Sequence, residues 1–414
     1  MEYPKFRWFI LISLVIISSA GMMTMIAPSP FVQQISESIG TSYGETTAMT
    51  MMVVMSSTAV FALLTGFVVN RLGFALTWII GSAIQVIASL LLYPLSTSAE
   101  GLIFGRALQG MGMGPINAVL LPILAQWFKP GERTYVAAAA GVSAWFGASL
   151  GLVYSPAMYG LFGESWRMAL TMSAVPPAIA LIFAFIIFFG PKPPVTLAPE
   201  TPEAKKIQTN DFRLSLKTSA IWIVFTMAFF EAWYQWAFNN MAPGFYAVDP
   251  PVGLGLGPVV AGLKLTWAGY ASMLGTVAAP FVFEQMFKGK PKAPLTICCM
   301  ISAVLILGLL PVTKESGIIL ILLPCGMLFF SSVVNPTIYG YMSKHYPESA
   351  VGRIGGIATF LAAGGSCIGL AVGSAALHLT GSYTVPNIIL AIVVLIAGSS
   401  AIFLKDPGIK PTEV

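Results

Sequence analysis

The feature that most constrains this sequence is a series of twelve long apolar runs, each bounded by charged or turn-forming residues. About 20 mainly apolar residues in a helix are needed to cross the hydrocarbon core of a bilayer. Strands of an outer-membrane barrel would instead alternate polar and apolar residues. The runs lie at 8–28, 46–69, 75–94, 100–126, 135–158, 168–190, 218–246, 257–286, 294–312, 317–343, 354–378 and 385–404. They predict an all-α membrane protein with twelve transmembrane helices.

Charge is too scarce for a soluble protein of this length. Only 9% of the 414 residues are charged and 57% are hydrophobic, whereas a soluble domain is about a quarter charged. This excludes a soluble enzyme, a nucleic-acid-binding protein and a disordered chain. The net charge of +5 therefore indicates no nucleic-acid partner, and the partner that the composition predicts is the lipid bilayer.

The chain divides into two halves around one long polar segment. We expect six helices in 1–190, a cytoplasmic linker at 191–217, and six more helices in 218–414. The linker carries five basic residues and several prolines. Two six-helix bundles around a central cavity are an architecture of secondary transporters.

Glycines support an internal repeat of the two halves. Gly147 and Gly151 lie four residues apart in the fifth run, and Gly365 and Gly369 have the same spacing in the eleventh. Small residues four apart allow two membrane helices to approach closely. The matching positions predict pseudo-repeats with the same packing in each half.

Basic residues predict the orientation. With the N-terminus in the cytoplasm, seventeen Lys and Arg residues fall in cytoplasmic segments and only Arg167 and Lys314 in outer loops. Cytoplasmic loops are enriched in Lys and Arg. We therefore expect a protein of the cell inner membrane with both termini in the cytoplasm.

Two short motifs resemble the major facilitator superfamily. The fourth run contains Arg106-Ala-Leu-Gln109-Gly110-Met-Gly112, which is similar to the fourth-helix motif of that family. The segment Gly66-Phe-Val-Val-Asn70-Arg71-Leu-Gly73 is similar to its loop motif between helices two and three, with Asn70 where the family usually has aspartate. Glu284 lies at the corresponding place of the second half. The resemblance implies a gating role for Asn70, Arg71 and Glu284.

The resemblance also implies which helices line the cavity, and the motifs indicate which modes of transport to expect. Helices one, four, seven and ten line the cavity in this family. No glycine-rich phosphate loop ending in Lys-Ser/Thr is present, so ATP-driven transport by this chain is not expected. No metal or cofactor is expected either, because no spacing of metal ligands is visible. The helix-five antiporter motif matches poorly, which favours uniport or symport, and anion exchange stays an alternative.

Arg106 is the first candidate for binding a solute. Ionisable side chains inside a membrane are expensive and mark functional sites. Arg106 and Asn117 lie on one face of the fourth run, where a guanidinium could hold a carboxylate through two parallel hydrogen bonds. The alternative is that Arg106 braces a neighbouring backbone.

Lys264 and Glu231 are the other two ionisable groups well inside the runs. An ammonium at Lys264 needs an anion, which could be the solute or Glu231. It could also extend to the membrane interface. The Glu231 carboxyl can gain and lose a proton as its surroundings change between apolar and wet. We therefore expect Glu231 to couple transport to protons, unless it is a permanent partner of Lys264.

Further polar and aromatic residues complete the candidate substrate site. Tyr234 and Gln235 follow Glu231 by one turn, and Asn335 and Tyr339 lie in the tenth run. Trp267 lies deeper in its run than the tryptophans expected at membrane interfaces. Together with Arg106, Lys264 and Asn117, these residues are expected to contact the solute.

These observations predict a monomeric secondary transporter of a small organic anion, such as a monocarboxylate, that moves together with protons. Another possibility is a zwitterion or an amine, bound by Glu231 among the aromatic side chains. A membrane enzyme would need clustered acid, base or metal residues at the membrane face, and the spans contain no paired carboxylates. A sensor would usually add a soluble output domain.

Overall fold

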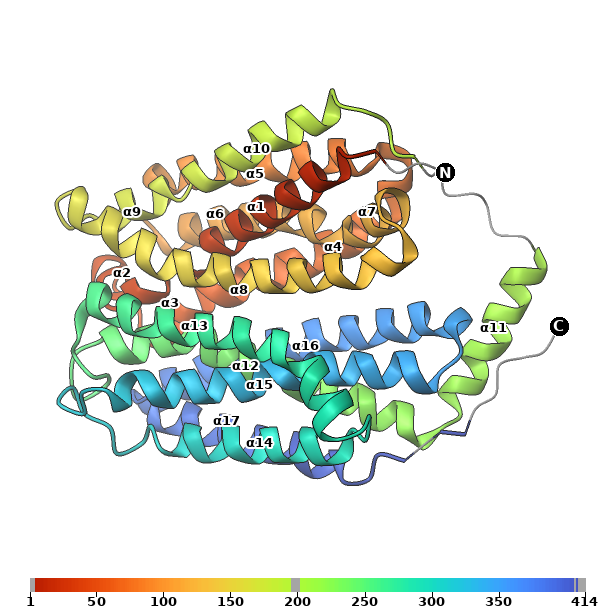
Figure 1. Cartoon of the computed structure of the whole chain (residues 1–414). Helices are drawn as coiled ribbons and strands as arrows, with labels where there is room; N and C mark the ends of the chain where they lie inside the picture. The colour runs from red at the N-terminus through yellow and green to blue at the C-terminus, as the bar shows by residue number, and fades with distance from the viewer. Residues whose placement is uncertain (1–3, 195–201, 406, 409–414) are drawn as a thin grey trace. The chain divides into compact units, whose positions relative to one another are not determined.

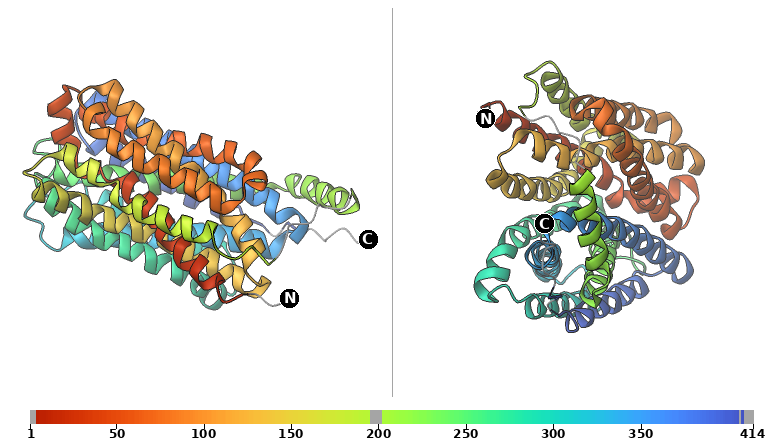
Figure 2. Two further views of the ribbon diagram at one scale, coloured as in Figure 1. Left: turned by 90° about the horizontal axis from the view of Figure 1, so that it is seen from above. Right: turned by 90° about the vertical axis from the view of Figure 1, so that its right-hand side faces the viewer.

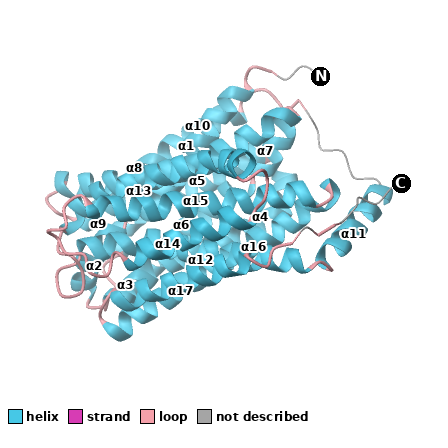
Figure 3. Cartoon of the chain, turned by 60° about the horizontal axis from the view of Figure 1, so that its bottom comes forward, coloured by secondary structure: helices cyan, strands magenta, loops and turns pink. Residues whose placement is uncertain are grey.

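The computed structural model describes residues 4–194, 202–405 and 407–408. Residues 195–201 of the predicted linker, and Lys410, lie outside these ranges. Throughout the described ranges the chain forms helices and loops and no strand (Figure 3). The prediction of an all-α protein is confirmed.

Every predicted apolar run coincides with one helix or with consecutive helical segments (Figure 1). The first six spans are α1 (Arg7–Ile26), α4 (Val53–Leu72), α5 (Phe74–Leu95), α6 (Ala99–Ala118) with α7 (Leu120–Trp127), α8 (Pro130–Leu161), and α9 (Trp166–Met172) with α10 (Val175–Phe188). The second six are α12 (Ser219–Ala247), α13 (Gly257–Phe281), α14 (Lys292–Leu307), α15 (Ile319–His345), α16 (Glu348–Thr380) and α17 (Thr384–Ala401). The chain therefore has twelve transmembrane helices in two six-helix pseudo-repeats.

Most of these helices are long and apolar enough to cross a bilayer. In the described part of the chain, nine helices meet that condition, or ten if the bent pair Gln208–Leu216 and Ser219–Ala247 is one span. The 25-residue α13 and the 16-residue α14 complete the twelve predicted spans.

The segment between α1 and α4 is irregular, and this was not predicted. It forms the short helices η1 (Ser29–Phe31), α2 (Val32–Ile39) and α3 (Tyr43–Thr47), followed by the π-helix η2 (Ala48–Met52). Gly40 ends α2 with φ 79°, a conformation that glycine adopts without steric cost. Ser42 and Glu45 form a capping box that begins α3.

The chain packs into two compact units that do not follow the order of the sequence. Unit 1 comprises Met1–Leu197, Asn240–Tyr270 and Ser374–Tyr383, and unit 2 comprises Ala198–Asn239, Ala271–Gly373 and Thr384–Val414. Unit 1 thus combines the first half of the sequence with two segments of the second half. The division of the sequence into six-helix halves, which end and begin at 190 and 217, remains a prediction.

Unit 1 has two ends that differ in their contacts. At one end α1 and α8 begin side by side, and the Arg7 guanidinium forms an ion pair with Glu132. At the opposite end, here called the distal end, Gln33 hydrogen-bonds Asp249 and Ser42 hydrogen-bonds His378. Contacts at the distal end therefore connect segments from the two halves of the sequence.

The glycines of the predicted repeat have the same packing role in both halves. A Cβ atom on Gly147 of α8 would collide with the backbone of Ser19 in α1, and one on Gly365 of α16 would collide with the backbone of Phe229 in α12. In each half, the absence of a side chain lets the fifth helix approach the first. The packing confirms the repeat.

The predicted linker contains a helix, α11 (Pro202–Leu216), which lies beyond the ends of α15 and α16 in unit 2 (Figures 1 and 2). It meets α12 at an 81° bend. The Ser349 hydroxyl donates a hydrogen bond to the buried Asp211 carboxylate, and Arg353 donates one to the Thr209 hydroxyl. The described part of the linker is therefore attached to unit 2.

Candidate functional site

Arg106 lies in unit 1 and is completely buried. Its Nε donates a hydrogen bond to the carbonyl oxygen of Thr50 at 2.6 Å. Its Nη1 and Nη2 donate to the carbonyl oxygens of Thr24 and Met25 at 3.1 and 2.7 Å. The guanidinium therefore connects three segments of the unit, because Thr24 and Met25 belong to α1 and Thr50 to η2.

These acceptors explain how a buried cation is tolerated without a carboxylate partner. α1 ends at Ile26, and the last four carbonyls of a helix have no acceptor role within it and carry the negative end of its dipole. Thr50 lies in a π-helix, where the regular hydrogen-bond ladder is shifted. Arg106 thus stabilises a helix end and a helix irregularity, so its geometry matches the bracing alternative.

Gln109 extends this network and was not predicted as a site residue. Its Oε1 accepts a hydrogen bond from Arg106 Nη1 at 2.6 Å, and its Nε2 donates to the Ser89 hydroxyl at 2.8 Å. The available signal was the motif itself, since Arg106 and Gln109 are three residues apart and share a helix face. The network links α6 to α5.

Glu231 lies in α12 within unit 2 and is 1% exposed. Its Oε2 accepts a hydrogen bond from Asn335 Nδ2 of α15 at 3.2 Å. Its Oε1 is buried and has no hydrogen-bond partner among the described residues. A buried polar atom without a partner costs about 1–3 kcal/mol, so this oxygen calls for a water molecule, a proton or a ligand.

Further hydrogen-bonded polar side chains lie one helical turn from Glu231 on α12 and one turn from its partner Asn335 on α15. Gln235, one turn further along α12, donates hydrogen bonds to the hydroxyls of Ser331 at 3.0 Å and Ser332 at 3.3 Å. Tyr339, one turn beyond Asn335 on α15, hydrogen-bonds Thr359 of α16 at 2.8 Å. We define the unit 2 cluster by its members from these helices: Glu231, Gln235, Ser331, Ser332, Asn335, Tyr339 and Thr359. Four predicted site residues are thus brought together.

Tyr234 has a different environment from its neighbours in sequence. It is completely buried, whereas Trp233 and Trp236 on either side are partly exposed. Gly369 of α16 packs against the ring of Trp233, which a Cβ atom there would meet. Tyr234 therefore belongs to the packed interior of the unit.

Lys264 is partly buried in α13, within unit 1. Within that unit the Lys264 ammonium group has no hydrogen-bonding or ion-pairing partner among the described residues. Because Lys264 and Glu231 belong to different units, their pairing remains a prediction.

Trp267 lies on an exposed apolar stripe of α13. It is 57% exposed, and Leu263 and Val260, one and two turns earlier, are 52% and 41% exposed. Exposed apolar residues repeating at helical spacing are expected where a membrane helix faces lipid. Trp267 fits that surface, and the neighbouring Lys264 borders it.

The remaining predicted residues lie at helix ends. Asn117 is exposed near the end of α6. The side chains of Asn70 and Arg71 lie outside the described part of the structure. Glu284 forms an ion pair with Lys344 at 3.2 Å, and both side chains are about half exposed. This pair joins η3 (Val282–Met286) to the end of α15.

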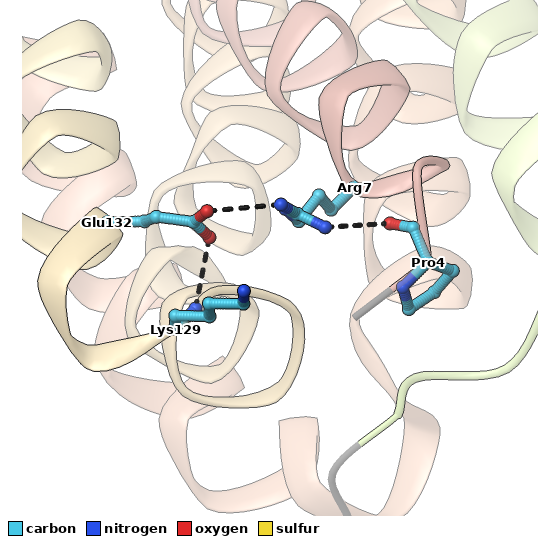
Figure 4. Close-up of polar contacts among 4 residues, drawn as sticks. All are labelled: Pro4, Arg7, Lys129 and Glu132. Atoms are coloured by element: carbon cyan, nitrogen blue, oxygen red, sulfur yellow. Dashed lines mark hydrogen bonds and ion pairs between the residues drawn. The ribbon is translucent and has the colours of Figure 1, made fainter. Parts of the chain in front are cut away.

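The first half has an ionic contact at the start of α1 and α8 that was not predicted (Figure 4). The Arg7 guanidinium lies 3.1 Å from Glu132 Oε1, while Glu132 Oε2 accepts a hydrogen bond from the backbone N–H of Lys129 at 3.2 Å. Glu132 therefore caps α8 and binds α1 at the same time.

These features define a class of protein. Among the described residues there is no group of three or more His, Cys, Asp and Glu side chains that could hold a metal ion. Two six-helix repeats with buried polar groups on interrupted helices are the architecture of a secondary transporter. The chain belongs to the Major Facilitator Superfamily, whose family model matches residues 10–370.

Two comparisons place the chain within this fold. It is 26% identical over 373 residues to a hexuronate transporter of Bacillus subtilis (strain 168), covering 83% of this chain and 80% of the relative. Among solved structures, it is similar to a bacterial homolog of the human lysosomal transporter Spinster, in an inward-facing and unoccupied conformation. That likeness has a TM-score of 0.74 at 13% identity and covers 97% of this chain and 98% of the other. The chain is thus a multi-pass membrane transporter.

Proposed function

We propose that this protein is a proton-coupled transporter of a small organic anion, with sugar acids of the hexuronate type as the first candidates. The observation that carries the proposal is the buried Glu231 oxygen without a described partner, within a cluster of amides and hydroxyls. Such groups exchange hydrogen bonds with the hydroxyls of a sugar acid. The relative's name, hexuronate transporter, supports this class of solute.

We assign the contact with the carboxylate of the solute to Lys264. Arg106, the other predicted cation, already donates four hydrogen bonds to protein acceptors and is fully buried. Lys264 has no partner in the described part of its own unit, so its ammonium group can bind an anion. A charge-assisted hydrogen bond of this kind is about twice as strong as a neutral one.

Glu231 provides a physical reason for proton coupling. An ionised carboxylate repels an anionic solute, whereas a protonated carboxyl can donate a hydrogen bond to it. In this proposal Glu231 takes up a proton when the anion binds and releases it on the other side of the membrane. Anion and proton then move together, as in symport.

A zwitterion or an amine is the second candidate solute. Within unit 2, no ion pair joins Glu231 to a cation among the described residues. An ionised Glu231 could therefore bind an ammonium group. Anion exchange is a further possible mode for the same site.

We also propose in which membrane the protein lies and how it is oriented there. We propose that the protein is a monomer in the cell inner membrane with both termini in the cytoplasm. The seventeen-to-two distribution of basic residues supports that orientation.

A binding assay on purified protein tests the proposed solute. Glucuronate and galacturonate are compared with glucose and galactose, which lack the carboxylate, and with small amines. Ligand that binds only the folded protein raises its melting temperature. We expect stabilisation by the acids only, and a loss of affinity of about tenfold or more in Lys264→Gln but not in Lys264→Arg. Stabilisation by the neutral sugars, or equal affinity in Lys264→Gln, would overturn the anion site.

A further inference from the structure

A polar stripe runs along one face of α5, inside unit 1. Trp78, Ser82, Gln85 and Ser89 follow one another at intervals of three and four residues, which places them on one helix face. Each of these side chains is at most 1% exposed. The stripe is about 16 Å long at the rise of an α-helix. Its polar groups need partners inside the protein, because the hydrocarbon of a bilayer supplies none.

The two ends of the stripe differ in their hydrogen bonds. The Ser89 hydroxyl accepts a hydrogen bond from Gln109 Nε2 at 2.8 Å, so it belongs to the network of Arg106. In contrast, Ser82 Oγ, Gln85 Oε1 and Trp78 Nε1 are buried and have no partner among the described residues. Buried polar atoms are rarely left unpaired in native proteins. Three of them on one helix face therefore indicate a bound molecule.

The helix that packs against this face has a backbone group without its helical partner. α6 contains Pro115, which lacks an N–H and cannot bond the carbonyl oxygen of Met111 four residues earlier. A Cβ atom on Gly81 of α5 would lie 3.4 Å from Pro115 Cβ, and one on Gly112 of α6 would lie 2.8 Å from Gln85 Cγ. The proline and Gln85 thus both lie at the contact between α5 and α6.

The Gln85 side chain extends from this contact toward α1. A Cβ atom on Gly21 of α1 would lie 3.5 Å from Gln85 Nε2 and 3.7 Å from Met113 Cε of α6. Gln85 and Met113 therefore meet the same point of α1, in the interior where α1, α5 and α6 come together. Met113 is itself 5% exposed.

We propose that ordered water binds between α5 and α6 and makes the hydrogen bonds that Ser82, Gln85 and the Met111 carbonyl lack. A buried water makes about three hydrogen bonds to polar groups that are otherwise unsatisfied. Water suits these groups because they are neutral and include both donors and acceptors. Trp78 Nε1, one turn before Ser82, can donate to the same chain of water.

The proposed water has a structural consequence for α6. Backbone groups freed by proline in a membrane helix are satisfied by neighbouring side chains or ordered water. Here the water extends the network of Arg106 by one turn of α5, from Ser89 to Gln85. It gives α6 a hydrogen-bonding partner at Pro115, between Arg106 and Asn117.

Radiolytic footprinting tests for this water without any solute. An X-ray pulse produces hydroxyl radicals from water, bound water included, and these radicals oxidise the nearest reactive side chain. Met113 is the reporter, and Met327 of α15 in unit 2, which is 0% exposed, is the control methionine. Mass spectrometry of purified protein in detergent measures both rates. We expect Met113 to be oxidised several-fold faster than Met327, also when a scavenger removes radicals from the bulk solvent.

Two variants connect the oxidation to the stripe. Ser82→Ala combined with Gln85→Leu removes two partners of the water, so we expect the Met113 rate to fall to that of Met327. Ser13→Ala is the matched control, because Ser13 is also 0% exposed but its hydroxyl donates to the Phe9 carbonyl at 2.8 Å. It should leave the Met113 rate unchanged.

Three results would overturn the proposal. Equally slow oxidation of Met113 and Met327 in the wild type would indicate a dry interior. An unchanged Met113 rate in the double variant would place the water elsewhere. A melting temperature raised by sodium chloride but not by choline chloride, with the rise lost in the double variant, would assign the site to a cation. Since no solute is present, these outcomes are independent of the proposed transport function.

Discussion

Two buried ionisable side chains differ in how far their hydrogen-bonding capacity is used. Arg106 uses four of its five donors within the protein. Glu231 has one described partner and a second oxygen without any among the described residues. A saturated cation suits a structural role, whereas an unsaturated acid suits binding and proton transfer. This contrast separates Arg106, for which the sequence predicted solute binding or bracing of a backbone, from Glu231, for which it predicted proton coupling.

Replacing Arg106 by lysine tests the structural role. Lysine keeps the charge but has a single nitrogen and cannot reach all four acceptors of the planar guanidinium. We expect a loss of stability of about 2 kcal/mol or more, since each hydrogen bond to a charged group contributes about 1.5–3 kcal/mol. Thermal unfolding in detergent measures it. Arg213→Lys, at an exposed position of α11, should behave as wild type, and normal stability with lost anion affinity in Arg106→Lys would restore Arg106 to the binding site.

The sequence could identify the ionisable residues of the site but not their partners. Arg106 and Glu231 stand out because charge is rare in the apolar runs. The carbonyls of Thr24, Met25 and Thr50 do not stand out, because every residue has a carbonyl. Which of them lack a helical partner depends on where α1 ends and where η2 shifts the ladder.

At the scale of helices, glycine determines which helices approach closely. The backbone of α16 contacts that of α12 at Gly365, while nothing lies within 4 Å of a Cβ atom at the adjacent Gly364. These neighbours in one helix provide a matched pair of positions.

Alanine should therefore lower the stability of the protein at Gly365 but not at Gly364. We expect Gly365→Ala to destabilise the protein by about 1–3 kcal/mol, because the methyl group forces the helices apart. We expect Gly364→Ala to be neutral, or stabilising by up to about 1 kcal/mol through its better helix propensity. Thermal unfolding of both variants under identical conditions is the measurement. Equal effects at the two positions would argue against the backbone contact.

Helices were predicted well where a continuous apolar run was the only signal required. The run 75–94 matches α5 (Phe74–Leu95) and 385–404 matches α17 (Thr384–Ala401) within a few residues. Interruptions such as η2 and the break between α9 and α10 were missed, because the apolar pattern continues through them. The irregularity of η2 provides the Thr50 carbonyl for Arg106, so the missed features include part of the site.

At the scale of the whole molecule, the ends of the helices differ in the contacts they make. The ion pairs Arg7–Glu132 and Glu284–Lys344 each stay within one half of the sequence. The distal contacts of Gln33 and Ser42 join the two halves. In the proposed orientation the distal end faces away from the cytoplasm.

The orientation has a direct test with single cysteines in intact cells. Lys192→Cys lies in the linker and Glu315→Cys in the loop between α14 and α15, and both positions are exposed. With the native cysteines replaced, a membrane-impermeant thiol reagent added outside should label Glu315→Cys and spare Lys192→Cys. Labelling of the linker position with protection of the loop position would invert the topology.

The most direct test of the central proposal is transport by Glu231→Gln in proteoliposomes supplied with radiolabelled glucuronate. Glutamine resembles the protonated carboxyl, but its side chain cannot take up a proton on one side of the membrane and release it on the other. We expect this variant to exchange glucuronate across the membrane at equal pH, and to fail to accumulate it when a pH gradient is imposed. Wild type, and the control Glu315→Gln at an exposed loop, should do both. Accumulation by Glu231→Gln at the wild-type rate under the pH gradient would contradict the account.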